Sequence, residues 1–396
     1  MRRAWAWVVA GFLVMGAMAV ALVLGEVSLR LFYPQPMGVW HQDRDGLALH
    51  WPGLVTYLPQ FGLSVSLNSA GMRDREHTVE KPETVFRVLV LGDSFMEALQ
   101  VPFESSFPNL LERRLASRTG RVIEVVNASV SGWGTDDELK YLTSYGTKWK
   151  ADLILVAMTL HNDVHDNLRK RFHTMEDGAL VEKSPPRLSF WQYKLIELKG
   201  LLASRSHAYQ LLIRTRRLPE VRDEATRLNS HVLDLFSRTT NGSVATGIEL
   251  TRLLLERIRS IGTQHGARVT LVLLPLAVQL SDERFATFAR ATSGSTRGLE
   301  INKPQRLLRR VGDRVGIDVI DLLPGFREWT AGSGGGLYLE RDGHWNEPGH
   351  RLAAEIVARE LINRHLVWVR YGSARRKGPL LVFADEDGGD RSNAAH

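Results

Sequence analysis

The fold of this chain is decided by the stretch Val88-Leu89-Val90-Leu91-Gly92-Asp93-Ser94-Phe95, in which four apolar residues run into Gly-Asp-Ser. A short apolar run that ends at a turn is typical of a buried strand in a parallel sheet. Open α/β sheets place ligands and chemistry at the carboxyl ends of such strands. Ser94 is therefore a candidate nucleophile. The alternative is that Asp93 and Ser94 only cap the following helix, a common use of both residue types.

Strands and helices alternate along the rest of the chain. Apolar runs predict strands at 85–91, 122–127, 152–159, 268–274 and 317–321. Helical spacing of apolar residues predicts helices at 106–118, 135–149, 248–264, 303–311 and 348–365. The alternation predicts an α/β fold with a mainly parallel sheet that is covered by helices on both faces. Residues 165–245 interrupt the pattern, and we expect them to form a helical insertion that caps the site.

The N-terminus carries a candidate membrane anchor. Residues 4–25 contain no charge, and as a helix they would be about 33 Å long, enough to span a bilayer. Arg2 and Arg3 precede this run, and Trp5 and Trp7 lie at its start, as interfacial anchors do. The positive charges predict a cytoplasmic N-terminus and a periplasmic body. A cleaved signal peptide is the alternative, but the length of the run favours an anchor that is retained.

Four parts are expected: a transmembrane anchor at 1–31, a connecting segment with short strands at 32–82, a catalytic domain at 83–368, and a disordered tail at 369–396. The chain has no cysteine, which excludes disulfides and thiolate zinc sites. Its net charge of +7 comes from scattered basic residues without a nucleic-acid-binding motif. We therefore expect no nucleic-acid partner. A basic surface also suits an anionic membrane or glycan.

A second polar stretch, Asp342-Gly343-His344-Trp345, precedes the last predicted helix. In an extended chain, residues i and i+2 face the same way, so Asp342 and His344 lie side by side. A serine nucleophile needs a base to take its proton, and histidine usually serves as that base. A carboxylate then fixes the tautomer of the histidine. The alternative, a plain helix start at Asn346, does not account for the Asp-x-His pair.

Two further loops follow predicted strands. Gly132 lies in the loop after strand 122–127, where glycine allows a backbone N–H to approach a substrate closely. Asn162 follows strand 152–159, and its side-chain amide is a candidate donor to a developing oxyanion. Taken singly, a glycine turn and an Asx turn explain the two residues better than a functional role does.

Taken together, these blocks resemble the SGNH (GDSL-type) hydrolase family. The resemblance implies a three-layer α/β/α flavodoxin-like fold, an acyl-enzyme mechanism and no cofactor. It implies Ser94 as nucleophile, His344 as base and Asp342 as the residue that orients His344. The oxyanion hole would consist of the Ser94 and Gly132 backbone N–H groups and the Asn162 amide. The matching blocks are Gly92-Asp93-Ser94, Gly132, Asn162-Asp163 and Asp342-x-His344.

Other features place the chain near one branch of that family. The Asp-x-His-Trp form, one residue shorter than the common Asp-x-x-His, resembles that of the alginate and cell-wall O-acetylation proteins. Leu160 stands where the third block usually has glycine. The stretch from Asn68 to Arg73 resembles a segment of membrane-anchored bacterial members. Arg73 either reaches an acid near the site or forms a surface salt bridge.

These observations predict a serine esterase that acts on acyl esters, first of all acetyl esters, of a glycan outside the cytoplasm. The alternatives are an O-acetyltransferase that works with a multi-span membrane partner, a lipid esterase, or a non-catalytic glycan-binding or assembly factor. Trp133 and Trp345 flank the predicted site, where each either stacks on a sugar or packs in the core.

Two other catalytic readings are weaker. An α/β-hydrolase elbow needs Gly-x-Ser-x-Gly, but Met96 occupies the second glycine position. A metal site would use side chains of suitable type that follow strand 152–159, but no metallohydrolase motif accompanies them, so we expect no metal. Those side chains are His161, Asp163, His165 and Asp166.

Overall fold

The computed structural model describes residues 2–160, 163–169, 171–183, 189–215, 232–333, 335–340 and 342–367. Its centre is a five-stranded sheet with the spatial order β11-β10-β7-β5-β6. All neighbouring strands of this sheet are parallel. Numbered along the chain, the order is 2-1-3-4-5, the flavodoxin-like doubly wound order. The strands are β5 (Val85–Gly92), β6 (Val122–Ser129), β7 (Leu153–Thr159), β10 (Arg268–Leu274) and β11 (Asp318–Asp321).

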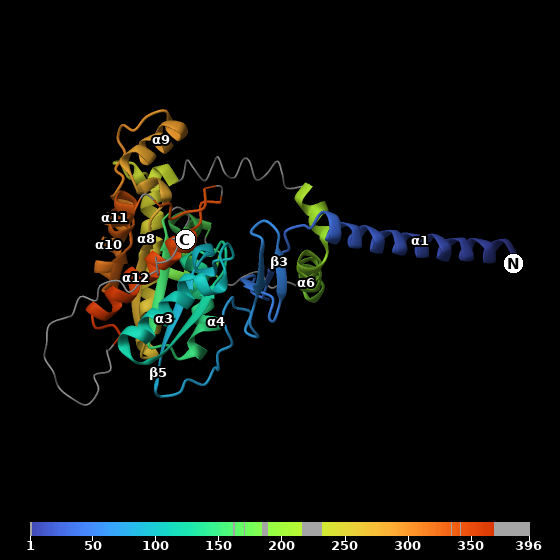
Figure 1. Ribbon diagram of the computed structural model, residues 1–396, viewed down its shortest axis with the longest axis horizontal. Coiled ribbons are helices and arrows are strands. Elements are labelled where there is room, and N and C mark those ends of the chain that lie inside the picture. The colour runs from blue at the N-terminus through green and yellow to red at the C-terminus, as the bar shows by residue number, and fades with distance from the viewer. Residues whose placement is uncertain are drawn as a thin grey trace, which may run out of the picture.

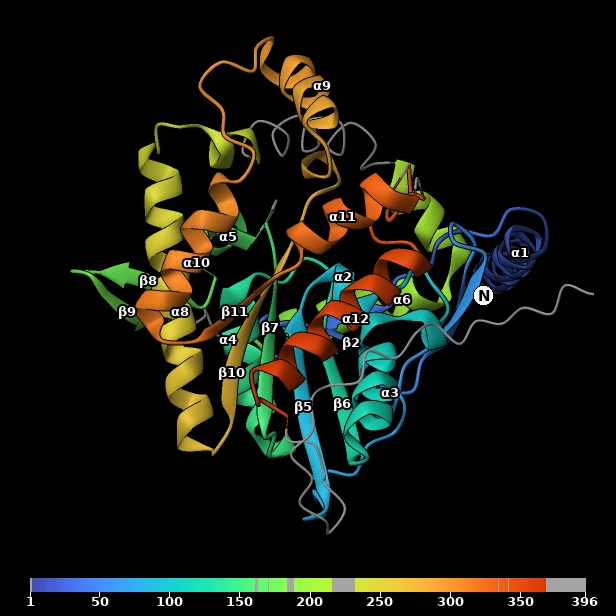
Figure 2. The ribbon, with the colours of Figure 1, turned by 60° about the vertical axis from the view of Figure 1, so that its left-hand side comes forward.

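Helices cover both faces of this sheet, which confirms the predicted three-layer α/β fold (Figure 2). Alternate residues of each strand enter two separate cores, as the period of a strand requires. In β5, Leu89 and Leu91 belong to one core, and Val88 and Val90 belong to the other. The first core contains α4 (Thr135–Ser144), α8 (Gly242–Gln264) and α10 (Lys303–Val315), and the second contains α3 (Phe107–Thr119), α11 (Leu323–Ser333) and α12 (Glu347–Asn363).

The predicted helix at 135–149 is in fact two elements. α4 ends at Ser144, and a 3-10 turn, η2, follows over Gly146–Trp149. At Gly146 the backbone comes so close to the sheet that a Cβ atom there would lie 3.1 Å from a Leu142 methyl and 3.4 Å from a Leu89 methyl. Helical periodicity continues through this point in the sequence, so the break is set by packing against the sheet rather than by local pattern.

The first helix stands apart from the body of the molecule. α1 (Arg2–Phe32) projects away from the body in Figure 1. Its segment Trp5–Phe32 is long and apolar enough to cross a membrane, and no part of its most apolar stretch is buried against the rest of the protein. A signal sequence near the N-terminus passes the same test of length and composition.

The connecting segment forms two antiparallel hairpins between α1 and the sheet. The expected short strand near residues 62–67 is present as β4. The hairpin strands are β1 (Trp40–Gln42), β2 (Ala48–His50), β3 (Val55–Leu58) and β4 (Leu63–Ser66).

The expected insertion at 165–245 is not a simple helical cap. Its described part begins with α5 (Asp163–Asp166), η3 (Asn167–Arg169) and an antiparallel hairpin of β8 (His173–Glu176) and β9 (Ala179–Glu182). α6 (Phe190–Arg205) then packs on β1 near the end of α1 (Figure 1). The expected disordered tail at 369–396 lies outside the described residues.

A buried ion pair links β5, the strand that precedes the serine, to the neighbouring strand β6. The Arg87 side chain on β5 is 0 % exposed, and its Nη2 lies 2.7 Å from Glu124 Oε2 on the neighbouring β6. Its Nη1 donates to Trp149 O at 2.8 Å, and its Nη2 donates to Thr78 O at 2.9 Å. With a further bond from Nη1 to Val79 O at 3.2 Å, the fully buried Arg87 side chain satisfies a carboxylate and three carbonyl oxygens.

We expect Arg87→Met to lower the free energy of unfolding by about 3–5 kcal/mol, because it leaves the Glu124 charge and these carbonyls without their partner. Urea unfolding of the full chain in detergent micelles, followed by circular dichroism, measures this loss. The control is Arg113→Met at an exposed position of α3, which we expect to change the free energy by less than ~0.5 kcal/mol. Equal effects of the two substitutions would contradict the prediction.

Candidate active site

Ser94 lies at the carboxyl end of β5, which is flanked by β7 and β6 in the sheet. It is the first residue of the one-turn helix α2 (Ser94–Glu97), and the Asp93 side chain caps this helix by accepting a hydrogen bond from Phe95 N at 3.0 Å. The capping interpretation is therefore correct for Asp93. At Gly92 a Cβ atom would lie 2.6 Å from Met96 Cγ, so only glycine allows this tight turn from strand to helix.

The Ser94 hydroxyl, the His344 ring and the Asp342 carboxylate form one chain of hydrogen bonds. His344 Nε2 lies 2.7 Å from Ser94 Oγ, and His344 Nδ1 lies 2.5 Å from Asp342 Oδ1. Burial alone would raise the pKa of the Asp342 carboxyl, yet the hydrogen bonds from the His344 ring and backbone hold this pKa below its usual range. Asp342 is thus ionised at neutral pH and fixes the ring with Nε2 facing the serine.

Local structure holds this loop in place. Leu339 and His344 are joined by a backbone hydrogen bond of 2.8 Å, and Gly343 takes the positive φ of +81° that the turn requires. The Phe95 ring packs against the His344 ring with 4.8 Å between their centroids. Asn346 caps α12 by accepting from Gly349 N at 3.0 Å. The Asp-x-His pair and the helix start are therefore both present.

Two backbone N–H groups are available beside the serine. Val130 N donates to Gly92 O at 3.2 Å, which holds the loop after β6 against the strand that carries Ser94. In that loop Gly132 has a φ of +80°, and the space where its Cβ would lie is open. Within the described part of the chain, the N–H groups of Ser94 and Gly132 donate no hydrogen bond. The third predicted donor, Asn162, lies outside the described residues.

Of the two alternatives for Trp133 and Trp345, stacking on a sugar or packing in the core, the structure shows core packing. Trp133 is 1 % exposed and Trp345 is 0 % exposed. Trp133 Nε1 donates to Ala48 O at 2.9 Å, while Trp345 packs edge-on against Phe95 with 5.3 Å between ring centroids. Trp345 thereby supports the residue that packs against His344.

Arg73 is buried, which excludes the alternative of a surface salt bridge. It is 3 % exposed and donates to three main-chain carbonyls at the end of α2: Glu97 O at 3.1 Å, Val101 O at 2.5 Å, and Ala98 O. Burial lowers the pKa of Arg73 to about 10, so it remains charged at neutral pH. Arg73 therefore holds the far end of the short helix that begins at Ser94.

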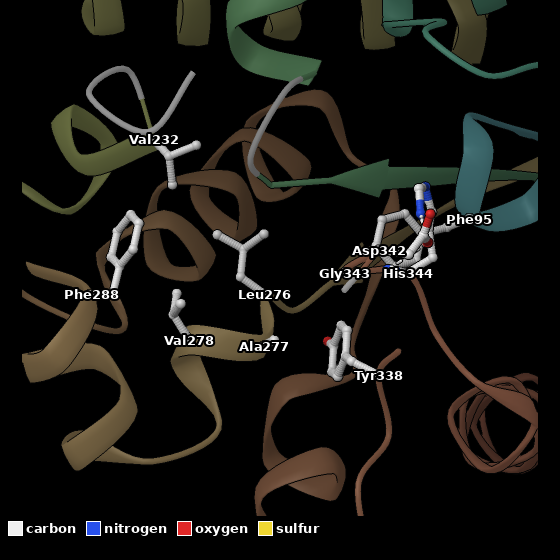
Figure 3. Close-up of a pocket in the computed structure, with 10 residues that line it drawn as sticks. All are labelled: Phe95, Val232, Leu276, Ala277, Val278, Phe288, Tyr338, Asp342, Gly343 and His344. Atoms are coloured by element: carbon white, nitrogen blue, oxygen red, sulfur yellow. Dashed lines mark hydrogen bonds and ion pairs between the residues drawn. The ribbon is translucent and has the colours of Figure 1, made fainter. Parts of the chain in front are cut away.

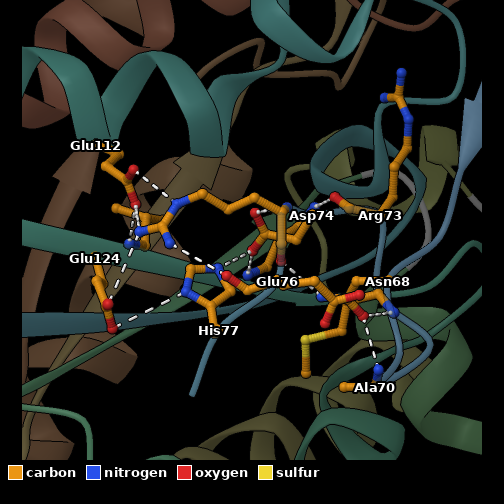
Figure 4. A network of polar contacts seen from close by, with 12 residues as sticks. Asn68, Ala70, Arg73, Asp74, Glu76, His77, Glu112 and Glu124 are labelled. Atoms are coloured by element: carbon orange, nitrogen blue, oxygen red, sulfur yellow. Dashed lines mark hydrogen bonds and ion pairs between the residues drawn. The ribbon is translucent and has the colours of Figure 1, made fainter. Parts of the chain in front are cut away.

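A turn in the connecting segment positions Arg73. Asn68 Oδ1 accepts from Ala70 N at 3.0 Å and from Met72 N at 2.8 Å. Gly71 has a φ of +72°, and a Cβ there would lie 2.7 Å from the His50 carbonyl oxygen. In Figure 4 the Arg73 side chain leaves this turn in a direction away from the ion pairs around Glu112 and Glu124. The Asn-x-x-Gly-x-Arg stretch is thus structural support for the serine.

Glu97, which sequence reasoning missed, joins α2 to the Gly132 loop. Its buried Oε1 lies 2.8 Å from Trp40 Nε1 and 2.5 Å from His50 Nε2. Its Oε2 accepts from the Ser131 N–H at 3.1 Å and from the Ser131 hydroxyl. One carboxylate therefore ties together the turn with the serine and the loop with the second candidate oxyanion donor. No motif in the sequence signals this role.

Behind the site lies a group of buried acids. Burial, with the neighbouring Asp93 charge, raises the pKa values of Glu138 and Asp163 well above the usual range. Asp163 Oδ2 accepts from Thr159 N at 2.7 Å. In the described ranges no three His, Asp or Glu side chains are arranged to hold a metal, and His161 lies outside those ranges.

A mostly apolar pocket of about 230 Å³ opens beside the hydrogen-bonded residues His344 and Asp342 (Figure 3). Asp342, Gly343 and His344 line one end of it, and Figure 3 shows Val232 and Phe288 at the other. Phe288 belongs to α9 (Asp282–Ser293), and no residue of α6 is among the described residues that line the pocket. The sequence missed this lining, because it comes from segments without a motif. The remaining lining residues are Phe95, Leu276, Ala277, Val278 and Tyr338.

Comparisons with known proteins concern the family of this chain rather than its individual site residues. A family model described as SGNH hydrolase-like domain, acetyltransferase AlgX, matches residues 235–385. An arylesterase from Vibrio mimicus is 36 % identical over 101 residues, which cover 24 % of this chain. The chain spans 50 % of the length of that relative.

Solved structures resemble the chain only loosely. TesA is 16 % identical over 69 % of this chain and 97 % of its own, with a TM-score of 0.36. The acetyl xylan esterase AlAXEase is 14 % identical over 70 % of this chain and 100 % of its own, with a TM-score of 0.39. Scores this low carry no argument about this chain, so the fold rests on its own strand order. Residues 235–385 resemble the SGNH hydrolase-like domain of AlgX. The strand order and the Gly-Asp-Ser and Asp-x-His blocks agree with a relation to the SGNH hydrolases.

Proposed function

We propose that this protein is a serine esterase that cleaves acyl esters through an acyl-enzyme. The observation that carries the proposal is the unbroken hydrogen-bonded chain from Ser94 through His344 to Asp342 at the carboxyl end of β5. This is the arrangement that activates a serine hydroxyl. The arylesterase relative supports the same reaction class.

In the proposed reaction, Ser94 Oγ attacks the ester carbonyl carbon while His344 Nε2 takes the hydroxyl proton. The tetrahedral intermediate then expels the alcohol oxygen, which receives that proton from His344. Water repeats the sequence on the acyl-enzyme and releases the carboxylic acid and free Ser94. Asp342 keeps its charge throughout and stabilises the imidazolium that forms in both halves.

The oxyanion of the intermediate would accept hydrogen bonds from the Ser94 and Gly132 N–H groups. Their free donors support this role, since preformed donors aimed at a developing charge are worth about 10²–10³-fold in rate each. We retain the Asn162 amide as the proposed third donor. Glu97 contributes indirectly, because it holds the two loops that carry the first two donors at one place.

For the substrate we propose acetyl esters of a glycan. The match to a model described as an acetyltransferase supports an acetyl group. The same match supports an O-acetyltransferase, in which a sugar hydroxyl replaces water in the second step. That reaction would need an acyl donor delivered by a multi-span membrane partner, because the described residues hold only one helix long and apolar enough to span a membrane.

The apolar pocket favours a second candidate, a lipid esterase. A group the size of a water molecule takes up about 30 Å³. An acetyl group, which is only a few such groups in size, would therefore fill only part of the pocket of about 230 Å³. The apolar lining of Leu276, Val278 and Phe288 suits a longer acyl chain. We further propose that α1 is a retained anchor with a cytoplasmic N-terminus, which would place the site close to the lipid surface on the periplasmic side.

The test is hydrolysis of p-nitrophenyl esters from acetate to octanoate by the full chain in detergent, with and without an oligosaccharide acceptor. Release that is fastest with acetate supports the glycan acetyl esterase, and release that is faster with longer chains moves the assignment to a lipid esterase. Faster turnover together with acetylated oligosaccharide identifies a transferase. Release that does not depend on Ser94 rejects all three.

We expect Val278→Phe to lower kcat/KM for p-nitrophenyl octanoate at least about tenfold while acetate changes less than about twofold, since overfilling an apolar pocket by a few carbons is worth about 1–3 kcal/mol. The reason is that Val278 lines the pocket well beyond Leu276 as seen from His344 (Figure 3). The matched control is Val79→Phe at an exposed position. Equal losses on both esters would show that the pocket does not hold the acyl chain.

A further inference from the structure

α6 exposes a continuous apolar stripe. Trp191, Leu195, Leu198 and Leu202 are 78, 52, 50 and 38 % exposed. Their spacing of four, three and four residues places them on one side of a helix. Phe190 extends the stripe at its first residue and is also exposed. Apolar side chains in this pattern normally face a partner, and in this structure nothing covers them among the described residues.

The opposite side of α6 is fixed to the hairpins of the connecting segment. Gly200 is so close to Trp51 that a Cβ atom there would lie 3.2 Å from the indole ring. Gly38 N donates to Ala203 O at 2.9 Å, and Ser204 is buried. Because this side is occupied, the exposed stripe faces away from the hairpins.

The C-terminal end of α6 is tied to α1. Arg30 Nη2 donates to Arg205 O at 2.6 Å. The Glu26 carboxylate accepts from His207 N at 2.9 Å, Ala208 N at 3.0 Å and Ser206 Oγ at 3.0 Å. These bonds join α1 to the start of the helical residues 207–215.

This attachment sets the height of α6 relative to a membrane. Glu26 directly follows the charge-free run 4–25, so it lies where the hydrocarbon core would end. Figure 1 shows α6 on the side of the hairpins from which α1 leaves the body, with α1 running across the view and α6 seen close to end-on. The axis of α6 thus crosses that of α1, as it would for a helix that lies along a membrane surface.

The charges beside the stripe suit anionic headgroups. Four basic residues beside the stripe are exposed: Lys194, Lys199, Arg205 and Arg30. The acid of α6 that lies nearest to them is Glu197, which pairs with Lys194. Basic residues beside an apolar face that carries tryptophan and phenylalanine are typical of helices that lie in the membrane interface. An aromatic pair at the start of the helix is equally suited to the headgroup level.

We propose that α6 is an interfacial helix whose stripe Trp191–Leu195–Leu198–Leu202 inserts into the outer surface of the bilayer that α1 crosses. We infer that lipid rather than protein covers the stripe, for two reasons. The C-terminal end of the helix that carries the stripe is attached to α1 at the level of Glu26. The stripe is also flanked by net positive charge, which suits anionic lipids. α6 then fixes the orientation of the catalytic body above the membrane. The proposal uses the proposed anchor but is independent of the esterase reaction.

Single-cysteine variants of the full chain test this directly, since the chain has no cysteine of its own. Leu198→Cys, Val14→Cys and Ser117→Cys are labelled with the environment-sensitive fluorophore NBD and reconstituted into phosphatidylcholine–phosphatidylglycerol nanodiscs. Val14 lies in α1, and Ser117 is exposed on α3. Quenching is measured with spin-labelled lipid and with aqueous iodide. We expect the probe at 198 to emit at shorter wavelength than that at 117, with strong quenching by the lipid label and weak quenching by iodide.

Each pattern of quenching decides the proposal. Iodide quenching at 198 as strong as at 117 overturns it, and protection at 198 from both quenchers overturns it in favour of a protein partner or second copy. Lipid quenching at 14 without lipid quenching at 198 rejects interfacial docking while the anchor stands. Lipid quenching at 198 without lipid quenching at 14 shows that α6 binds lipid but overturns the proposal in its present form, because α1 would then not cross that bilayer. Leu195→Cys repeats the measurement one turn away in case the first variant misfolds.

Discussion

Ser94→Ala is expected to lower kcat for p-nitrophenyl acetate by about 10⁶-fold, the scale on which serine hydrolases lose turnover without their nucleophile. The residual rate would come from the oxyanion donors and substrate binding alone. The substitution removes only the hydroxyl whose oxygen lies 2.7 Å from His344 Nε2, and it leaves the Asp93 cap of α2 intact. A loss of activity in a folded variant is therefore attributable to chemistry.

The rate is measured with the full chain in detergent, and labelling with a fluorophosphonate probe reports the nucleophile independently of turnover. Ser117→Ala, on an exposed part of α3, is the matched control and is expected to retain wild-type rate and labelling. A folded Ser94→Ala protein that keeps both would mean that another residue carries the reaction. If neither wild type nor variant hydrolyses any ester, the assignment moves to a glycan-binding or assembly factor.

Asp342→Asn is expected to lower kcat by about 10⁴-fold with little change in KM, because the loss of the carboxylate releases the His344 ring into the wrong tautomer. Asp342 Oδ1 lies 2.5 Å from His344 Nδ1, and Asp342 also accepts the His344 backbone N–H at 3.3 Å. Asparagine keeps the size of the side chain but not its charge. The defect should therefore appear in the chemical step rather than in substrate binding or folding.

Steady-state kinetics at several pH values measure this effect. Asp313→Asn changes an exposed aspartate of α10 in the same way and is expected to leave kcat unchanged. A decrease of less than about tenfold for Asp342→Asn would mean that a different group orients His344. A rise in KM at constant kcat would make Asp342 a substrate-binding residue instead.

Local patterns in the sequence predicted the sheet and the candidate catalytic residues. Strand and helix periods are local properties, so the five apolar runs predicted the five strands, and their alternation with helices predicted the parallel order. The Asp-x-His pair needs only two residues of extended chain, and Gly92 is required by the turn itself. Because parallel strands end at the same edge, Ser94 and a histidine from the last loop were expected to meet there.

Packing between distant segments decided the rest. Whether Trp133 and Trp345 face a sugar or the core depends on what covers them, which no local pattern records. Arg73 looks like a surface cation in the sequence, yet its carbonyl partners make it part of the support for Ser94. The pocket lining and the position of α6 likewise depend on contacts between segments far apart in the chain. The sequence by itself singled out the candidate catalytic residues, whereas the tertiary structure decided what surrounds them, since burial is a property of the packed chain.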